Sequence, residues 1–197
     1  MNRRCLTLAI LLTILLAAGA ATAQDGRWLL GLDGLSSHVQ DNNEEDLVSI
    51  DEQSGGAALQ IGYRFSPAFM LRLYAGGASH PTSVGDIEIA FISSLIEGVY
   101  VFRDGAAFRP YLFGGLGGFK LESQADELVF ALEGGGVSFG AGAHYLVSGS
   151  VSLHGSLRLE AVNWNTATVS LGGVAIEAPV EESGFASKLT LGVAIWL

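Results

Sequence analysis

Residues 137–161 read VSFGAGAHYLVSGSVSLHGSLRLEA, and this stretch decides the fold. Apolar side chains recur at every second position on both sides of a central Ser148-Gly149 pair. A period of two is typical of a β-strand with one apolar face, and a Ser-Gly pair between two such runs predicts a tight hairpin. The intervening positions hold Gly, Ser and charged residues. The stretch therefore predicts two antiparallel strands with one apolar and one polar face.

The same alternation divides the chain into eight expected strands, at about 26–37, 54–65, 68–79, 87–102, 109–122, 135–147, 151–164 and 184–197. The connections at 66–67, 104–105 and 148–149 are short, whereas those at 38–53, 80–86, 123–134 and 165–183 are longer. Short turns at one end and long loops at the other are typical of transmembrane β-barrels, because a sheet in lipid must close on itself. We expect an all-β fold, an eight-stranded antiparallel up-and-down transmembrane β-barrel.

A soluble β-sandwich or lipocalin-like barrel would also alternate, but its apolar face would point inwards. Here aromatic residues gather at the short-turn ends of the expected strands, as in the aromatic girdle at a membrane interface. This observation favours the membrane barrel. We assign to the girdle Trp28, Tyr63, Phe65, Tyr100, Phe102, Tyr145 and Trp196.

The N-terminal residues form a separate segment. Arg3 and Arg4 precede an apolar run over 6–18, and small residues at 21–23 stand before Gln24. This order predicts a cleaved secretory signal peptide, and the apolar run is short for a membrane-spanning helix. We therefore expect a signal peptide over 1–23 and one barrel domain over 24–197.

Composition excludes several classes of function. The formal net charge of −10 argues against nucleic acid as a partner, since phosphate backbones attract clustered Lys and Arg. The only cysteine, Cys5, lies in the expected signal peptide, so disulfides and Cys-based zinc sites are excluded. The glycine runs at 114–118 and 134–136 lack the Lys-Ser/Thr of a phosphate-binding loop. No cofactor is expected.

The segment Arg109-Pro110-Tyr111 followed by LFGGLGG, the strand end Tyr100-Val101-Phe102 and the alternating last segment together carry a family resemblance. The chain resembles the small eight-stranded outer-membrane barrels of Gram-negative bacteria, of the OmpA transmembrane-domain, OmpX and OmpW kind. The resemblance implies residence in the bacterial outer membrane, contact with its lipid and lipopolysaccharide, and insertion by the outer-membrane assembly machinery. It implies a role in envelope integrity and surface interaction or, as in OmpW, a narrow path for small or hydrophobic solutes.

Alternation also places charged side chains on the face that would line the lumen. Charges in so narrow a space persist only when they are paired and hydrogen-bonded. Arg72 and Glu97, like Glu160 and Lys188, stand at matching heights on neighbouring strands, so we expect salt bridges that plug the lumen. An open pore is the alternative. Lys120 and Gln60 fall on the same face, and the expected charge network comprises Asp33, Arg64, Arg72, Glu97, Arg158, Glu160 and Lys188.

His144 and His154 lie symmetrically about the 148–149 turn, which places both imidazoles side by side in the lumen. Two histidines without a third ligand do not make a metal site, so we expect a hydrogen-bonded interior pair. His154-Gly155-Ser156 resembles the His-x-Ser motif of barrels that deacylate lipid A, but Leu157-Arg158 replace that family's Asn-Ala. Alternation also turns both residues away from lipid. We expect no catalytic residue and no enzymatic activity.

The expected long loops are acidic and contain no Lys or Arg. Such loops attract cations or basic partners, although a solvated rim that resists aggregation is the simpler interpretation. The ligand of this surface is not identified by the sequence. The apolar run over 167–178 either extends the sheet or packs over the barrel mouth. The acidic residues assigned to the loops are Asp41, Glu44, Glu45, Asp46, Asp51, Glu52, Glu181 and Glu182.

Overall fold

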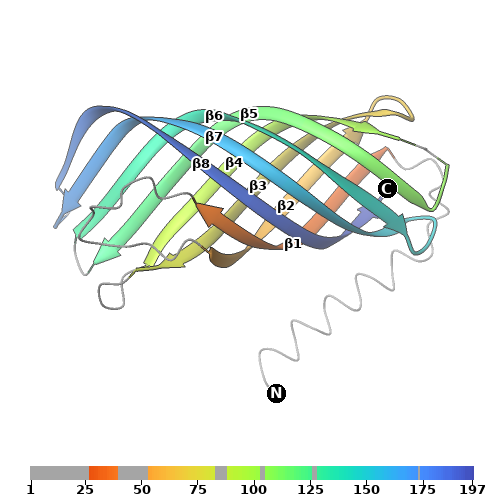
Figure 1. The fold of residues 1–197 in the computed structure, drawn as a ribbon, viewed down its shortest axis with the longest axis horizontal. Coiled ribbons are helices and arrows are strands. Elements are labelled where there is room, and N and C mark those ends of the chain that lie inside the picture. The colour runs from red at the N-terminus through yellow and green to blue at the C-terminus, as the bar shows by residue number, and fades with distance from the viewer. Residues whose placement is uncertain (1–26, 40–52, 83–87, 103–104, 126–127, 173) are drawn as a thin grey trace, which may run out of the picture.

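The computed structural model describes residues 27–39, 53–82, 88–102, 105–125, 128–172 and 174–197. Within these residues, eight strands form a closed barrel in which each strand pairs antiparallel with its neighbours in the chain, and β8 pairs with β1 (Figure 1). The expected eight-stranded up-and-down barrel is confirmed. The expected signal peptide lies outside the described residues. No helix in the described ranges is long and apolar enough to cross a membrane.

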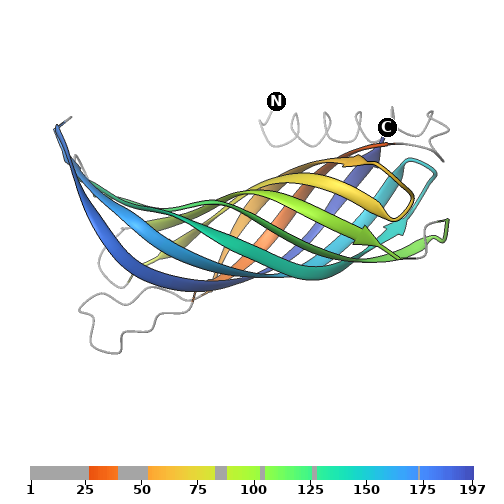
Figure 2. The ribbon, with the colours of Figure 1, turned by 90° about the horizontal axis from the view of Figure 1, so that it is seen from above.

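The strands fall into two groups by length. The first four have 12 to 14 residues: β1 (Trp28–Val39), β2 (Gln53–Arg64), β3 (Phe69–Pro81) and β4 (Glu88–Val101). The last four have 18 to 23 residues: β5 (Phe108–Ala125), β6 (Leu128–Leu146), β7 (Val151–Leu171) and β8 (Val174–Trp196). At the end opposite the short turns, β5–β8 therefore project beyond β1–β4 (Figure 2). We call this part, residues 122–125, 128–133, 165–172 and 174–182, the projecting sheet.

The prediction of two of the four long loops is wrong, because most of their residues belong to strands. We expected loops over 123–134 and 165–183, but β5 and β6 are connected across 126–127, and β7 and β8 across 172–173. Carboxylates and glycines there suggested loops, yet the residues between them alternate and pair, with Val169 opposite both Phe130 and Ile176. The run over 167–178 thus extends the sheet. The turn uses Gly172 at φ 57°, a left-handed conformation that glycine adopts without steric cost.

The outer surface of the barrel is apolar, the reverse of a soluble protein. Every second side chain of each strand points outwards, and these positions form an exposed belt that contacts lipid acyl chains in a membrane. The belt includes Leu30, Leu32, Leu59, Ile61, Leu71, Leu73, Ile92, Ile96, Leu112, Leu116, Val137, Phe139, Leu157, Leu189 and Leu191.

Two apolar clusters fill the interior, with polar side chains between them. The cluster near the short turns contains Met70, Val99 and Tyr111, whereas the cluster towards the projecting sheet contains Leu95 and Phe119 among others. On β1, β3 and β4 the buried charged residues Asp33, Arg72 and Glu97 fall between these clusters, as Arg72 falls between Met70 and Tyr74. An interior of eight strands is narrow enough for side chains to fill it. This charged layer therefore lies between the two apolar clusters.

Candidate functional site

Glu97 on β4 is the centre of the polar layer and is fully buried. Arg72 lies opposite it on β3, and its Nε and Nη2 approach Glu97 Oε2 at 2.8 and 2.7 Å. Arg158 reaches Glu97 from β7, across the lumen, with Nη1 donating to Oε1 and Nη2 lying 3.3 Å from Oε2. Ser138 on β6 donates to Oε1 at 3.0 Å. One carboxylate thus ties opposite walls of the barrel together.

Glu160 and Lys188 form a second buried pair beside this centre. Their Nζ and Oε2 atoms are 2.9 Å apart, and Lys188 also donates to Ser93 Oγ at 2.8 Å. Because Lys188 belongs to β8 and Ser93 to β4, this contact also crosses the lumen. The structure therefore brings together both pairs that alternation predicted, Arg72–Glu97 and Glu160–Lys188.

Asp33 on β1 connects the histidines to the arginines. His154 Nε2 lies 2.6 Å from Asp33 Oδ1, and Gln60 Nε2 donates to Oδ2 at 2.8 Å. Gln60 Oε1 in turn accepts a hydrogen bond from Arg72 Nη1 at 3.1 Å. Gly192 leaves the room for this group, since a Cβ there would overlap the Asp33 carboxylate and the Leu32 carbonyl oxygen. A continuous series of side-chain contacts therefore runs from His154 through Asp33, Gln60 and Arg72 to Glu97.

His144 and His154 stack, with ring centroids 5.0 Å apart and planes inclined by 3°. His144 Nδ1 lies 3.1 Å from Ser152 Oγ, and the Trp196 indole donates to the same Oγ at 3.0 Å. These contacts hold the pair inside the barrel. Among the described residues, no group of three or more His, Cys, Asp or Glu side chains is arranged to hold a metal ion.

Aromatic rings enclose the two central arginines. The Arg158 guanidinium lies 3.8 Å from the Tyr74 ring centroid, and those of Arg158 and Arg72 lie 4.7 and 4.6 Å from the Phe113 centroid. Rings in these positions stabilise the cations and displace water from around them. The rings and guanidiniums therefore pack side by side around the buried Glu97 carboxylate.

The assignment of Trp196 to the aromatic girdle is wrong. Its side chain is only 4% exposed and lies in the lumen, because even-numbered residues of this part of β8 point inwards. Arg64 lies half-buried at the short-turn end, with its guanidinium 5.7 Å from the Trp196 ring centroid. Arg64, which we assigned to the lumen charge network, therefore lies at the short-turn rim of the lumen. The other girdle residues are exposed or half-buried on the outer face: Trp28, Tyr63, Phe65, Tyr100, Phe102 and Tyr145.

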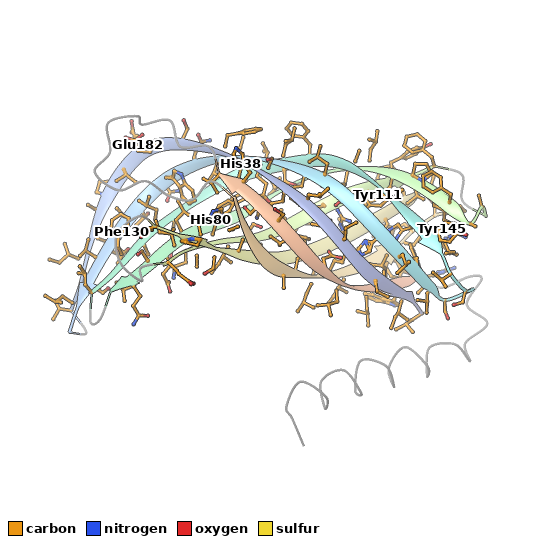
Figure 3. All side chains as sticks on the ribbon, turned by 60° about the horizontal axis from the view of Figure 1, so that its bottom comes forward. His38, His80, Tyr111, Phe130, Tyr145 and Glu182 are labelled. Carbon is orange, nitrogen blue, oxygen red and sulfur yellow. The ribbon has the colours of Figure 1, made fainter. Side chains whose placement is uncertain are left out.

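The acidic residues are also placed differently from expectation. Glu181 and Glu182 are exposed but lie within β8, and Figure 3 shows Glu182 at the end of the barrel opposite Tyr145. Lys120 points outwards instead of into the lumen, because it lies opposite the exposed Ile92, while odd-numbered Phe119 is buried. Asp41, Glu44, Glu45, Asp46, Asp51 and Glu52 lie outside the described residues.

Ser156, the serine of the deacylase-like motif, faces the lumen. Its hydroxyl is 2.7 Å from that of Thr190 on β8, and both side chains are buried. Sequence reasoning did not single out Thr190, Ser93, Ser138 or Ser152 as partners. All four follow the inward alternation of their strands, which is the signal that could have identified them.

The sequence profile of the outer membrane protein β-barrel domain matches residues 8–172. The chain belongs to this family. It is therefore a protein of the bacterial outer membrane. A search of curated proteins gave no match.

Solved structures share this barrel fold at low sequence identity. Neisserial surface protein A is similar with a TM-score of 0.63 and 14% identity, covering 86% of this chain and 97% of that one. OprG of Pseudomonas aeruginosa has a TM-score of 0.56 and 14% identity, with 87% and 97% covered. Ail, the attachment invasion locus protein of Yersinia pestis, has a TM-score of 0.57 and 12% identity, with 87% and 99% covered.

Proposed function

We propose that this protein is a non-enzymatic outer-membrane barrel whose plugged lumen serves as a rigid anchor for a surface that interacts with external partners and supports envelope integrity. The observation that carries the proposal is the coordination of Glu97 by Arg72 and Arg158 from opposite walls. A buried carboxylate held by two guanidiniums is costly to expose or move, because either step leaves charges without partners. This coordination supports a closed lumen.

The unequal strand lengths support the surface role. Beyond the apolar belt, β5–β8 continue as a paired sheet that carries the exposed acidic residues Glu177, Glu181 and Glu182. Such a sheet offers basic or cation-bearing partners a rigid surface. Ail has been solved in complex with the heparin analogue sucrose octasulfate, which is an example of a barrel of this fold with an external ligand. In the membrane, the apolar belt of the present protein would contact lipid and lipopolysaccharide, after insertion by the assembly machinery.

A narrow pore, or a path for hydrophobic solutes, is the competing function. Single-channel conductance in a planar bilayer separates the two, once heat-modifiable gel migration has established that the protein is folded. The plugged barrel is expected to be silent, with Glu122→Gln, which removes an outward carboxylate, equally silent. Reproducible discrete openings of the native protein would contradict the plug.

A further inference from the structure

The outer face of the projecting sheet carries a polar pocket that the charge layer does not use. Its volume is about 420 Å³. It is lined by Lys120 and Glu122 of β5, by Val129, Ala131 and Glu133 of β6, by Thr166, Thr168 and Ser170 of β7, and by Glu177 of β8.

The strand register fixes the side of the sheet on which this pocket opens. Lys120 lies opposite the outward-facing Ile92 on β4 and opposite Glu133 on β6. Glu133 in turn lies opposite Thr166 on β7. A register irregularity between Trp164 and Thr166 reverses which alternate residues of β7 face outwards. Trp164 is therefore buried inside, whereas Thr166 points outwards. From that point, the hydroxyls of β7 line the outer face.

The pocket begins where the apolar belt ends. On β6 the outward positions run from the exposed Val137 through Gly135 to Glu133. The four residue steps from Val137 to Glu133 correspond to roughly 13 Å of strand. The last apolar side chain in contact with acyl chains is therefore followed directly by Lys120, Glu122 and Glu133. We expect the head groups of the outer leaflet at this depth, because the apolar band of an outer-membrane barrel ends where the head groups begin.

The lining groups match a sugar better than an ion. Three half-buried hydroxyls on β7 both donate and accept hydrogen bonds, the carboxylates accept them, and Lys120 donates. Val129 and Ala131 supply a small apolar floor for the C–H face of a sugar ring. Lys120 pairs with Glu122, and its Nζ lies 3.8 Å from Glu133 Oε1. With Glu177, one lysine and three glutamates give the site a net charge of −2, which disfavours polyanions.

We propose that this pocket binds a neutral or amine-bearing saccharide, either as the head group of an outer-leaflet glycolipid or as a free oligosaccharide. The inference names a partner for the surface interaction proposed above and rests on that proposal. The volume accommodates one or two sugar rings. The expected order of affinity is amine-bearing before neutral before anionic saccharides.

The test uses the folded full chain in phospholipid nanodiscs, titrated by calorimetry with glucosamine oligosaccharide, maltohexaose and sucrose octasulfate. A second arm measures binding to phosphatidylcholine vesicles with and without a neutral diglycosyl glycolipid. The test variant is Thr168→Val with Glu177→Gln. The control is Ser79→Val with Glu88→Gln. Like Thr168 and Glu177, these two residues lie on neighbouring strands, and Ser79 Oγ donates to Glu88 Oε2 at 2.7 Å on the opposite side of the barrel.

We expect the test variant to weaken binding about tenfold or more and the control to change it less than about twofold. Binding of free oligosaccharide identifies a soluble sugar, whereas binding only to glycolipid-containing vesicles identifies a head group. The proposal is overturned if no arm shows binding, if both variants lose it equally, or if sucrose octasulfate binds best. Conductance distinguishes this failure from failure of the plug, since a silent barrel that binds no sugar refutes only the pocket.

Discussion

The two ends of β5–β8 present opposite polarity on the same strands. Within the membrane belt, outward residues such as Val137 and Phe139 are apolar, and inward residues such as Ser138 carry the polar layer. In the projecting sheet, Glu133 and its neighbours make the outer face polar. On the inner face, Leu121, Leu132 and Val180 pack against the apolar cluster that contains Leu95 and Phe119, which we call the upper cluster. Further along the same face lie Phe130, Val169 and Ile176.

This reversal teaches that the period of two identifies a strand but not which face meets lipid. The surrounding medium decides that. Beside acyl chains the outer face must be apolar, whereas above them the outer face meets head groups or water and the apolar side chains turn inwards. On β6 the reversal follows from composition alone, while on β7 an irregularity at Asn165 also changes which positions face outwards.

The largest effect is expected from Glu97→Gln. The substitution keeps the shape of the side chain but removes the carboxylate that both Arg72 and Arg158 contact, and leaves Arg158 only Glu160, 3.9 Å from its Nε. We expect the free energy of unfolding in lipid vesicles to fall by about 3–5 kcal/mol, as measured by urea titration. Glu122→Gln, which breaks the half-exposed pair with Lys120, should change it by less than about 1 kcal/mol. Equal effects of both substitutions would contradict a stabilising role for the charge layer.

Gly192→Ala is expected to have the next largest effect. A Cβ at this position would overlap the Asp33 carboxylate and the backbone of β1, so Asp33 and His154 would have to move. We expect a loss of about 1–3 kcal/mol in the same titration. Gly118→Ala is the matched control, since a Cβ there would contact nothing within 4 Å. Wild-type stability of Gly192→Ala would show that this group tolerates displacement.

These residues also mark the limit of sequence-based prediction. The barrel, its strand pairing and the Arg72–Glu97 and Glu160–Lys188 pairs followed from alternation. Residues on adjacent strands that lie equally far from the short-turn end come to face one another. Contacts across the lumen, such as Lys188 with Ser93, did not follow, since they depend on how the ring of strands closes. The projecting sheet was expected only as one of two alternatives for 167–178, because its carboxylates and glycines look like those of loops.

Trp196 illustrates a different error. Its position near a strand end suggested an interfacial role, although its even number placed it with the lumen residues of β8. We expect Trp196→Phe to reduce the free energy of unfolding by about 1 kcal/mol, because the hydrogen bond from the indole to Ser152 is lost. Trp28→Phe, on the exposed side of β1, is the control and should change it by less than about 0.5 kcal/mol. A larger loss for Trp28→Phe than for Trp196→Phe would contradict the buried position of Trp196 and support its assignment to the membrane interface.

The smallest effect is expected from Ile176→Ser, on the inner face of the projecting sheet. Ile176 is 71% exposed, so a polar side chain there removes little packing. The free energy of unfolding should change by less than about 0.5 kcal/mol, whereas Leu95→Ala, in the buried upper cluster, should cost about 2–5 kcal/mol. Urea titration of both variants compares the two regions directly. If Ile176→Ser cost as much as Leu95→Ala, the inner face of the projecting sheet would have to be covered in the folded protein, and the contrast between barrel and sheet would be one of polarity but not of packing.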